Sequence, residues 1–278
     1  STWTLHNVDA RTPAANVGAI NDAWVVLGVG GQPAALSTSW YSPAGAADDY
    51  MVTPAITLTS NNYLFFDAQA LDASFPDGYE VRLSTTNSTV AALSTVLLNV
   101  PAETATVWNS RRIDLSAYAN QTVHIAWRNN SNDQFVLAVD NIEVKEVISN
   151  DAGVEDLTIS DTYVTNSTIT IGGTIENTGL NTLNSVDINW STDGGVTVNT
   201  NSLTPSTASF GSTSFTHTIT ATALNPGLFT DLMVWTSNPN GVADSLNAND
   251  TIRTRFFVNN GTTVSREVLL EEFTTAPC

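Results

Sequence analysis

Cysteine and histidine are scarce in this chain of 278 residues. The one cysteine, Cys278, is the last residue, so a disulfide within the chain is excluded. The domains must therefore be large enough to fold without cross-links, or be held together by metal. The three histidines, His6, His124 and His217, are too few and too scattered to predict a histidine metal cluster.

Long apolar runs and catalytic motifs are also missing. No run of 18 apolar residues exists, so we predict no membrane insertion. No signal peptide stands at Ser1, and in a secreted protein that segment would have been removed. The sequence has no G-x-S-x-G or H-E-x-x-H motif and no glycine-rich phosphate loop, and Cys278 has no visible histidine partner. We therefore predict that the protein is not an enzyme.

Charged residues make up only 13% of the chain, about half the usual share in globular proteins. Acidic residues outnumber basic ones by 27 to 9, which gives a net charge of −18. This balance argues against a nucleic-acid partner and against charge-driven binding to anionic membranes, since both need Lys and Arg. It is compatible with calcium binding, and it also keeps a secreted protein soluble. With 42% hydrophobic residues, the composition suits an extracellular β-protein with real cores.

The stretch 121–144 carries the strongest structural signal. Apolar residues alternate with others over 123–127 and again over 135–139, with a polar turn at 129–133 between them. This period of two predicts two antiparallel strands, each with one buried face. Asp140 and Asn141 interrupt the second strand, and a buried carboxylate needs partners. We expect a metal ion or a set of backbone N–H groups to supply them.

The rest of the chain also consists of short strand signals separated by turns. Residues 1–147 predict a jelly-roll β-sandwich, 148–153 a linker, and 154–260 a second sandwich of about seven strands. Asp193-Gly194-Gly195 predicts a hairpin. The predicted fold class is thus all-β, with two sandwiches in sequence.

The first half resembles a known family. Four segments carry the resemblance, in order and in spacing: 48–56, 77–85, 108–118 and 121–144. Together they are similar to the cleaved-adhesin, or choice-of-anchor J, domain of secreted Bacteroidota proteins, over residues 1–147. The resemblance implies an adhesive domain of a secreted or surface-attached protein, exported by type IX secretion.

Two further resemblances follow. Residues 177–179, 190–195, 237–241 and 247–251 resemble the immunoglobulin-like modules that space out bacterial surface proteins. Residues 267–274 with Pro277 and Cys278 resemble the first strand and active-site loop of a thioredoxin-like domain, which would begin in 261–278. That similarity suggests that the chain is a fragment of a longer protein.

Asp9, Asp48, Asp49 and Asp140 are the calcium candidates. Calcium takes 6–8 oxygen ligands, and acidic residues near strand ends can converge in a jelly roll. The adhesin resemblance implies a structural calcium, whereas no contiguous D-x-D-x-D-G loop is present. The alternative is that these residues cap turns and accept backbone N–H bonds.

The ligand-binding candidates are Trp40 and Tyr41, whose rings could stack on a sugar, although tryptophans at strand spacing more often lie in a core. Asp72 and Asp77 could hold a cation or act as an acid–base pair, but we interpret them as turn residues around Pro76 and Gly78.

Ser245 and Thr251 follow aspartates in Asp-Ser-Leu and Asp-Thr-Ile. Both triplets match the short acceptor pattern of Bacteroidota periplasmic O-glycosylation, so we predict a glycoprotein modified at these two residues.

We therefore predict a non-catalytic, extracellular or cell-surface adhesion protein. Its calcium-stabilised jelly roll would bind a glycan or a surface protein, and its second sandwich would act as a spacer. One alternative is a set of accessory domains of a larger secreted enzyme, either a thioredoxin-like oxidoreductase or a hydrolase. Another is a stalk or filament subunit, completed by strand exchange along an exposed edge.

Overall fold

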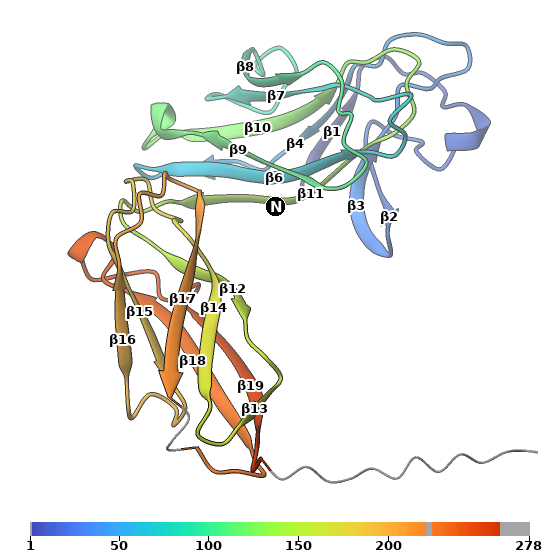
Figure 1. Cartoon of the computed structure of the whole chain (residues 1–278). Coiled ribbons are helices and arrows are strands. Elements are labelled where there is room, and N and C mark those ends of the chain that lie inside the picture. Colours follow the sequence, from blue (N-terminus) through green and yellow to red (C-terminus); the bar gives the residue numbers. More distant parts are fainter. Residues whose placement is uncertain (1, 221–223, 262–278) are drawn as a thin grey trace, which may run out of the picture. The chain divides into compact units, whose positions relative to one another are not determined.

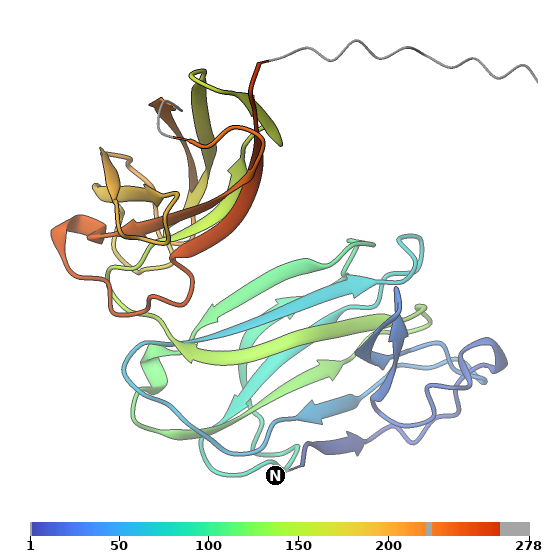
Figure 2. The same ribbon diagram turned by 90° about the horizontal axis from the view of Figure 1, so that it is seen from below.

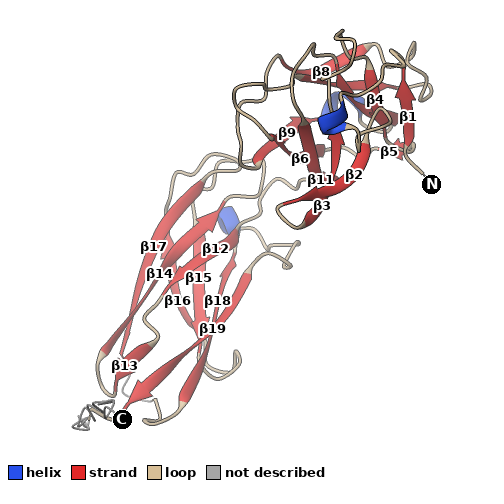
Figure 3. Ribbon diagram, turned by 90° about the vertical axis from the view of Figure 1, so that its right-hand side faces the viewer, coloured by secondary structure: helices blue, strands red, loops and turns tan. Residues whose placement is uncertain are grey.

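The computed structural model describes residues 2–220 and 224–261, and these are almost entirely strands and loops, with a few single turns of 3-10 helix (Figure 3). The chain divides into two compact units, residues 1–147 (unit 1) and residues 148–278 (unit 2). This confirms the predicted all-β class. The predicted thioredoxin-like start lies outside the described residues beyond Gly261.

Unit 1 is a sandwich of two antiparallel sheets that face each other (Figure 1). The first sheet runs in the order β1 (Thr4–Asn7), β4 (Asp49–Val52), β10 (Thr122–Asn129), β7 (Tyr79–Ser84) and β8 (Thr95–Val100), with β5 (Ile56–Thr57) also beside β10. The second runs β2 (Val25–Val29), β3 (Gln32–Ser37), β11 (Leu137–Glu146), β6 (Asn62–Ala70) and β9 (Asn109–Asp114). Two 3-10 turns, η1 (Ala15–Val17) and η2 (Ser116–Tyr118), lie between strands.

The core of unit 1 forms where the apolar faces of the two sheets meet. Val123, Ile125 and Trp127 of β10 are fully buried, as their alternation predicts. Phe66 of β6 meets Trp127 from the opposite sheet, with ring centroids 5.4 Å apart in an edge-to-face arrangement. Such aromatic pairs add to the stabilisation that burial of apolar area provides.

The two strands of the stretch 121–144 lie in different sheets. β10 pairs with β4 and β7, whereas β11 pairs with β3 and β6. Residues 130–136 therefore cross from one sheet to the other at one end of the sandwich. The β3–β4 and β6–β7 loops hydrogen-bond to this crossing segment, since the carbonyls of Ser39 and Phe75 accept from its backbone N–H groups.

The Asp140-Asn141 interruption is a β-bulge. The register of β11 against β6 shifts between Asp140 and Glu143, and Asn141 has a left-handed φ of 52°. Asn tolerates this conformation better than most residues. The side chain of Asn141 is exposed and donates to Asp67 Oδ2 at 2.6 Å, and Asp140 is only partly buried. The expectation of a buried charge is therefore wrong, because the bulge turns these side chains toward solvent.

Unit 2 is a second β-sandwich, seen with unit 1 in Figure 2. One sheet runs β12 (Gly153–Thr158), β14 (Thr168–Glu176) and β17 (Ser212–Thr220). The other runs β13 (Thr162–Val164), β19 (Thr251–Asn259), β18 (Phe229–Ser237), β15 (Val186–Ser191) and β16 (Asn199–Leu203), and the 3-10 turn η4 (Pro239–Gly241) follows β18. β15 and β16 form the predicted hairpin, and its Gly194 and Gly195 have positive φ.

Residues 148–153, expected to form a linker, are built into unit 2. Asp151, Ala152 and Gly153 are buried, and Gly153 begins β12. The carbonyls of Ile148 and Ser149 accept hydrogen bonds from the 180–181 backbone. Backbone pairing of this kind is available to any sequence, so the polar composition of the segment did not reveal it.

Candidate functional site

A pocket of about 300 Å³ lies where three loops of unit 1 meet. The loops connect β3 to β4, β6 to β7 and β10 to β11. The pocket is lined by Trp40, Asp72, Phe75, Asp133, Gln134 and Phe135. Aromatic and polar side chains thus share one small cavity, which is the usual composition of a small-molecule site.

The aromatic side chains of the pocket form an angled platform. The rings of Trp40 and Phe135 lie 5.9 Å apart with an interplanar angle of 59°. Phe75, in the loop between β6 and β7, is 55% exposed. An exposed aromatic ring beside two others offers apolar faces to a ligand.

Backbone hydrogen bonds fix the three loops to one another. The Phe135 N–H donates to the Phe75 carbonyl at 2.9 Å, and the Leu71 N–H donates to the Val136 carbonyl at 3.0 Å. The Thr38 hydroxyl donates to the Phe135 carbonyl and accepts from the Trp40 N–H. The platform is therefore held in place before any ligand binds.

Asp77, in the loop between β6 and β7, is fully buried and is linked through Ser39 to the pocket residue Gln134. Its Oδ1 accepts a hydrogen bond from the Ser39 hydroxyl at 2.6 Å, and that hydroxyl accepts from the Gln134 N–H at 3.0 Å. Burial raises the pKa of Asp77 to about 6, against the opposing effect of hydrogen bonding from Ser39, Asn129 and Ser131. The interpretation as a turn residue does not hold for Asp77, which lies outside a turn and is folded inward by its loop. Asp72 does act as a turn residue, accepting from the Ser74 N–H at 2.8 Å.

Tyr41, the second predicted platform residue, is buried rather than exposed. Its hydroxyl donates to Asp49 Oδ2 at 2.6 Å and lies 3.4 Å from Asp9 Oδ2. A side chain in this position cannot offer its ring to a ligand, so the prediction for Tyr41 is corrected. Trp40, its neighbour in sequence, points to the other side and lines the pocket.

Three of the four calcium candidates meet around Tyr41. The Asp48 N–H donates to Asp9 Oδ2 at 2.7 Å. The carboxylate of Asp48 also pairs with Arg128 at 2.7 Å. Burial raises the pKa of Asp49 to about 7, and the charges of Asp9 and Asp48 add to this while the Tyr41 hydroxyl opposes it. The Tyr41 hydroxyl, a backbone N–H and Arg128 thus already contact carboxylate oxygens of this cluster.

Asp140 stands apart from that cluster by topology, because it belongs to β11 in the opposite sheet from Asp49. Calcium at Asp9, Asp48, Asp49 and Asp140 stays a prediction. A different group of three carboxylates, Asp151, Asp244 and Asp250 of unit 2, is brought close enough to hold a metal ion. Sequence reasoning missed it, although Asp244 and Asp250 bound an asparagine-rich loop that could have been a signal.

Removing the Tyr41 hydroxyl tests the role of this cluster. In Tyr41→Phe, the buried Asp49 loses the donor to Oδ2, while its Oδ1 already has no partner in the described part of the chain. An unpaired buried acceptor costs about 1–3 kcal/mol, so we expect unit 1 to lose that much unfolding free energy at pH 7. Chemical denaturation of the two proteins measures it. An unchanged stability would show that the hydroxyl contributes nothing.

Ser245 and Thr251, the predicted O-glycosylation residues, are both exposed. Thr251 is the first residue of β19, and Ser245 lies in the loop before it. Their modification stays a prediction. The aspartates of both triplets are Asp244 and Asp250, which belong to the carboxylate group of unit 2.

Comparison with protein families decides the identity of unit 1. The model of the Cleaved Adhesin Domain matches residues 1–144. The chain belongs to the cleaved adhesin family. Hemagglutinin A of Porphyromonas gingivalis is 34% identical to this cleaved adhesin over 144 residues, covering 44% of the chain and 6% of that protein. The chain thus spans only a small part of the length of the curated relatives it matches.

Solved structures similar to this cleaved adhesin include a cleaved adhesin domain and a CARDB domain. The K1 cleaved adhesin domain of Lys-gingipain from Porphyromonas gingivalis is 20% identical with a TM-score of 0.37, covering 52% of this chain and 99% of that domain. The CARDB domain of PF1109 from Pyrococcus furiosus is 17% identical with a TM-score of 0.33, covering 41% of this chain and 99% of that domain. In the described part of the chain, no helical segment has the length and apolar character needed to span a membrane.

Proposed function

We propose that this cleaved adhesin is a non-catalytic adhesion module that recognises a glycan in the pocket formed by Trp40, Phe75 and Phe135. The observation that carries the proposal is the exposed ring of Phe75 beside the angled pair Trp40 and Phe135. Family membership and similarity to Hemagglutinin A support an adhesive role outside the cell.

The chemistry of the pocket suits a sugar ring. Aromatic faces pack against the C–H faces of a pyranose, and carboxylate and amide groups accept and donate hydrogen bonds to its hydroxyls. Asp72, Asp133 and Gln134 supply those polar groups at the rim. A volume of about 300 Å³ lies at the small end of ligand pockets, so we expect one or two sugar residues to bind.

The pocket also has the rigidity that selective binding needs. Its loops are cross-linked by backbone hydrogen bonds and by the buried Ser39–Asp77 pair. A pre-formed site loses less conformational entropy on binding, which favours affinity for small ligands. Weak binding of single sugars is still expected, and adhesion would then gain strength from several copies on one surface.

Screening the whole chain on an array of printed glycans tests this proposal, with isothermal titration calorimetry on the glycan that binds best. We expect Phe75→Ala to weaken that binding by about tenfold or more, because it removes a ring that is more than half exposed. Trp40→Ala should do the same.

Phe229→Ala is the matched control, since Phe229 is 62% exposed and lies in unit 2. It should leave glycan binding unchanged. A wild-type chain that binds no glycan on the array contradicts the proposal, and so does binding that Phe75→Ala and Phe229→Ala affect equally.

A further inference from the structure

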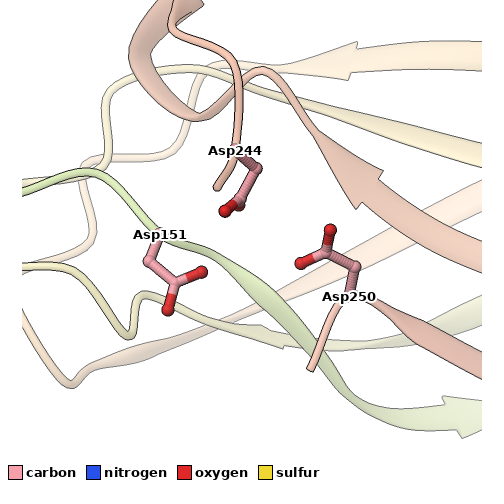
Figure 4. A group of neighbouring side chains, drawn as sticks. All are labelled: Asp151, Asp244 and Asp250. Atoms are coloured by element: carbon pink, nitrogen blue, oxygen red, sulfur yellow. The ribbon is translucent and has the colours of Figure 1, made fainter. Parts of the chain in front are cut away.

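Three aspartates of unit 2 converge although they come from distant parts of the chain. Asp151 lies just before β12, Asp250 immediately precedes β19, and Asp244 lies in the loop between η4 and β19. Figure 4 shows their carboxylates directed toward one another. One oxygen from each side chain lies within 4.8 Å of the others.

The group has no counter-charge within residues 2–220 and 224–261, where none of the three carboxylates takes part in an ion pair. The Asn249 amide lies 3.4 Å from both oxygens of Asp151, which is a long contact. Three like charges at this spacing repel one another, so the fold maintains an arrangement that is unfavourable without a counter-ion.

Asp250 supplies a second, independent observation. Asp250 is a buried residue with only 5% of its surface exposed, and its Oδ1 has no hydrogen-bond partner among the described residues. The Oδ2 of Asp244 is likewise buried without a partner. Buried carboxylate oxygens are nearly always paired with donors or metal ions. Both unpartnered oxygens belong to side chains directed into the same group.

Asn247 lies beside the same group. The NH₂ of its side-chain amide donates to Asp250 Oδ2 at 3.2 Å and to the Asp244 carbonyl oxygen at 3.2 Å. These are contacts of a neutral donor, and they leave Asp250 Oδ1 and Asp244 Oδ2 without a partner among the described residues.

We propose that Asp151, Asp244 and Asp250, with Asn247 beside them, form a calcium site in unit 2. The ligands are carboxylate oxygens, which suit calcium, and water would complete its 6–8 ligands. The group has no histidine or cysteine, the ligands that favour zinc and copper. Bound calcium would tie the start of β12 to the loop before β19.

The electrostatics of the ion-free protein agree with this assignment. Burial raises the pKa of Asp250 to about 7, and the charges of Asp244 and Asp151 raise it further. Burial also raises the pKa of Asp151.

Hydrogen–deuterium exchange of the whole chain, freed of metal with EDTA and titrated with calcium chloride, tests the site. We expect millimolar calcium to slow amide exchange at least about tenfold in residues 149–153 and 243–251, because a ligand that binds only the native state suppresses local opening. The thermal midpoint of unit 2 should rise in parallel.

Asp250→Asn should abolish both effects while folding normally, because the neutral amide resembles the protonated acid. Asp244→Asn is the second variant and should weaken them. Asp231→Asn, at an exposed position of β18, is the matched control and should respond as the wild type does. No calcium effect in these segments would overturn the proposal, as would an equal effect in Asp250→Asn. A calcium effect confined to unit 1 and lost only in Asp49→Asn would overturn it in favour of the cluster around Tyr41.

Discussion

Replacing Trp127 with alanine is expected to destabilise unit 1 by about 3–5 kcal/mol, close to the whole stability of many domains. Trp127 of β10 is fully buried in the hydrophobic core of unit 1. It meets Phe66 of the opposite sheet at 5.4 Å and Trp3 at 6.1 Å between ring centroids. The substitution removes apolar contacts to both sheets and leaves a cavity that strands paired on both sides cannot close.

Differential scanning calorimetry of the whole chain measures this loss, with the transition of unit 1 distinguished from that of unit 2. Trp40→Ala is the matched control, since it makes the same substitution at a partly exposed residue of the same unit. Its midpoint should fall much less. Equal losses for the two variants would show that Trp127 is not the centre of the core.

Unit 1 is expected to become less stable as the pH rises from about 5 to about 7.5. Asp49 and Asp77 are buried, and burial raises their pKa values from 3.8 to about 7 and about 6. Between the unfolded and folded pKa values, the folded state binds more protons than the unfolded state. Raising the pH through this window therefore favours unfolding, and the contribution is complete only below the unfolded pKa.

The size of this effect follows from about 1.4 kcal/mol for each pKa unit, which gives roughly 3 kcal/mol for Asp77 over its whole titration from the unfolded pKa upward, about half of it above pH 5. Glu80 acts in the opposite direction at lower pH. Burial would raise its pKa, but Arg82 and Arg128 lower it, so its contribution is lost as the pH falls below about 4.5. The falling trend should therefore be clearest above pH 5.

Chemical denaturation at several pH values measures the trend. Asp77→Asn and Asp49→Asn should each flatten it, because an amide does not titrate. Asp133→Asn is the control, since Asp133 is exposed and Asn accepts its left-handed φ of 55°. A slope that neither buried variant changes would contradict the assignment of the pH dependence to these two carboxyl groups.

Local patterns in the sequence predicted much of the secondary structure. The alternating stretch 123–127 lies within β10, and the Asp193-Gly194-Gly195 turn joins a real hairpin. These features depend on side-chain alternation and on turn residues, which act between neighbours in sequence. Trp40 was also recognised as a ligand-binding candidate, and it lines the pocket of unit 1.

The partners of those strands could not be predicted in the same way. Alternation marks a buried face but does not say which strand covers it, so the placement of β10 and β11 in opposite sheets was not foreseen. The inward orientation of Asp77 and the bulge at Asn141 also depend on backbone pairing with distant segments. Backbone hydrogen bonds carry no side-chain signature.

The sequence by itself determined that this protein is all-β, strongly acidic, without an intramolecular disulfide and similar to the cleaved adhesins over its first half. Composition and period-two alternation are sufficient for the first three conclusions, because neither depends on tertiary contacts. The similarity to the cleaved adhesins comes from the order and spacing of the segments 48–56, 77–85, 108–118 and 121–144. Only the tertiary structure decided which polar groups meet. It separated Tyr41 from the platform of Trp40, and it brought Asp151 to Asp244 and Asp250 from about a hundred residues away. Such sites form from the ends of strands whose pairing is set by the packing of the whole core.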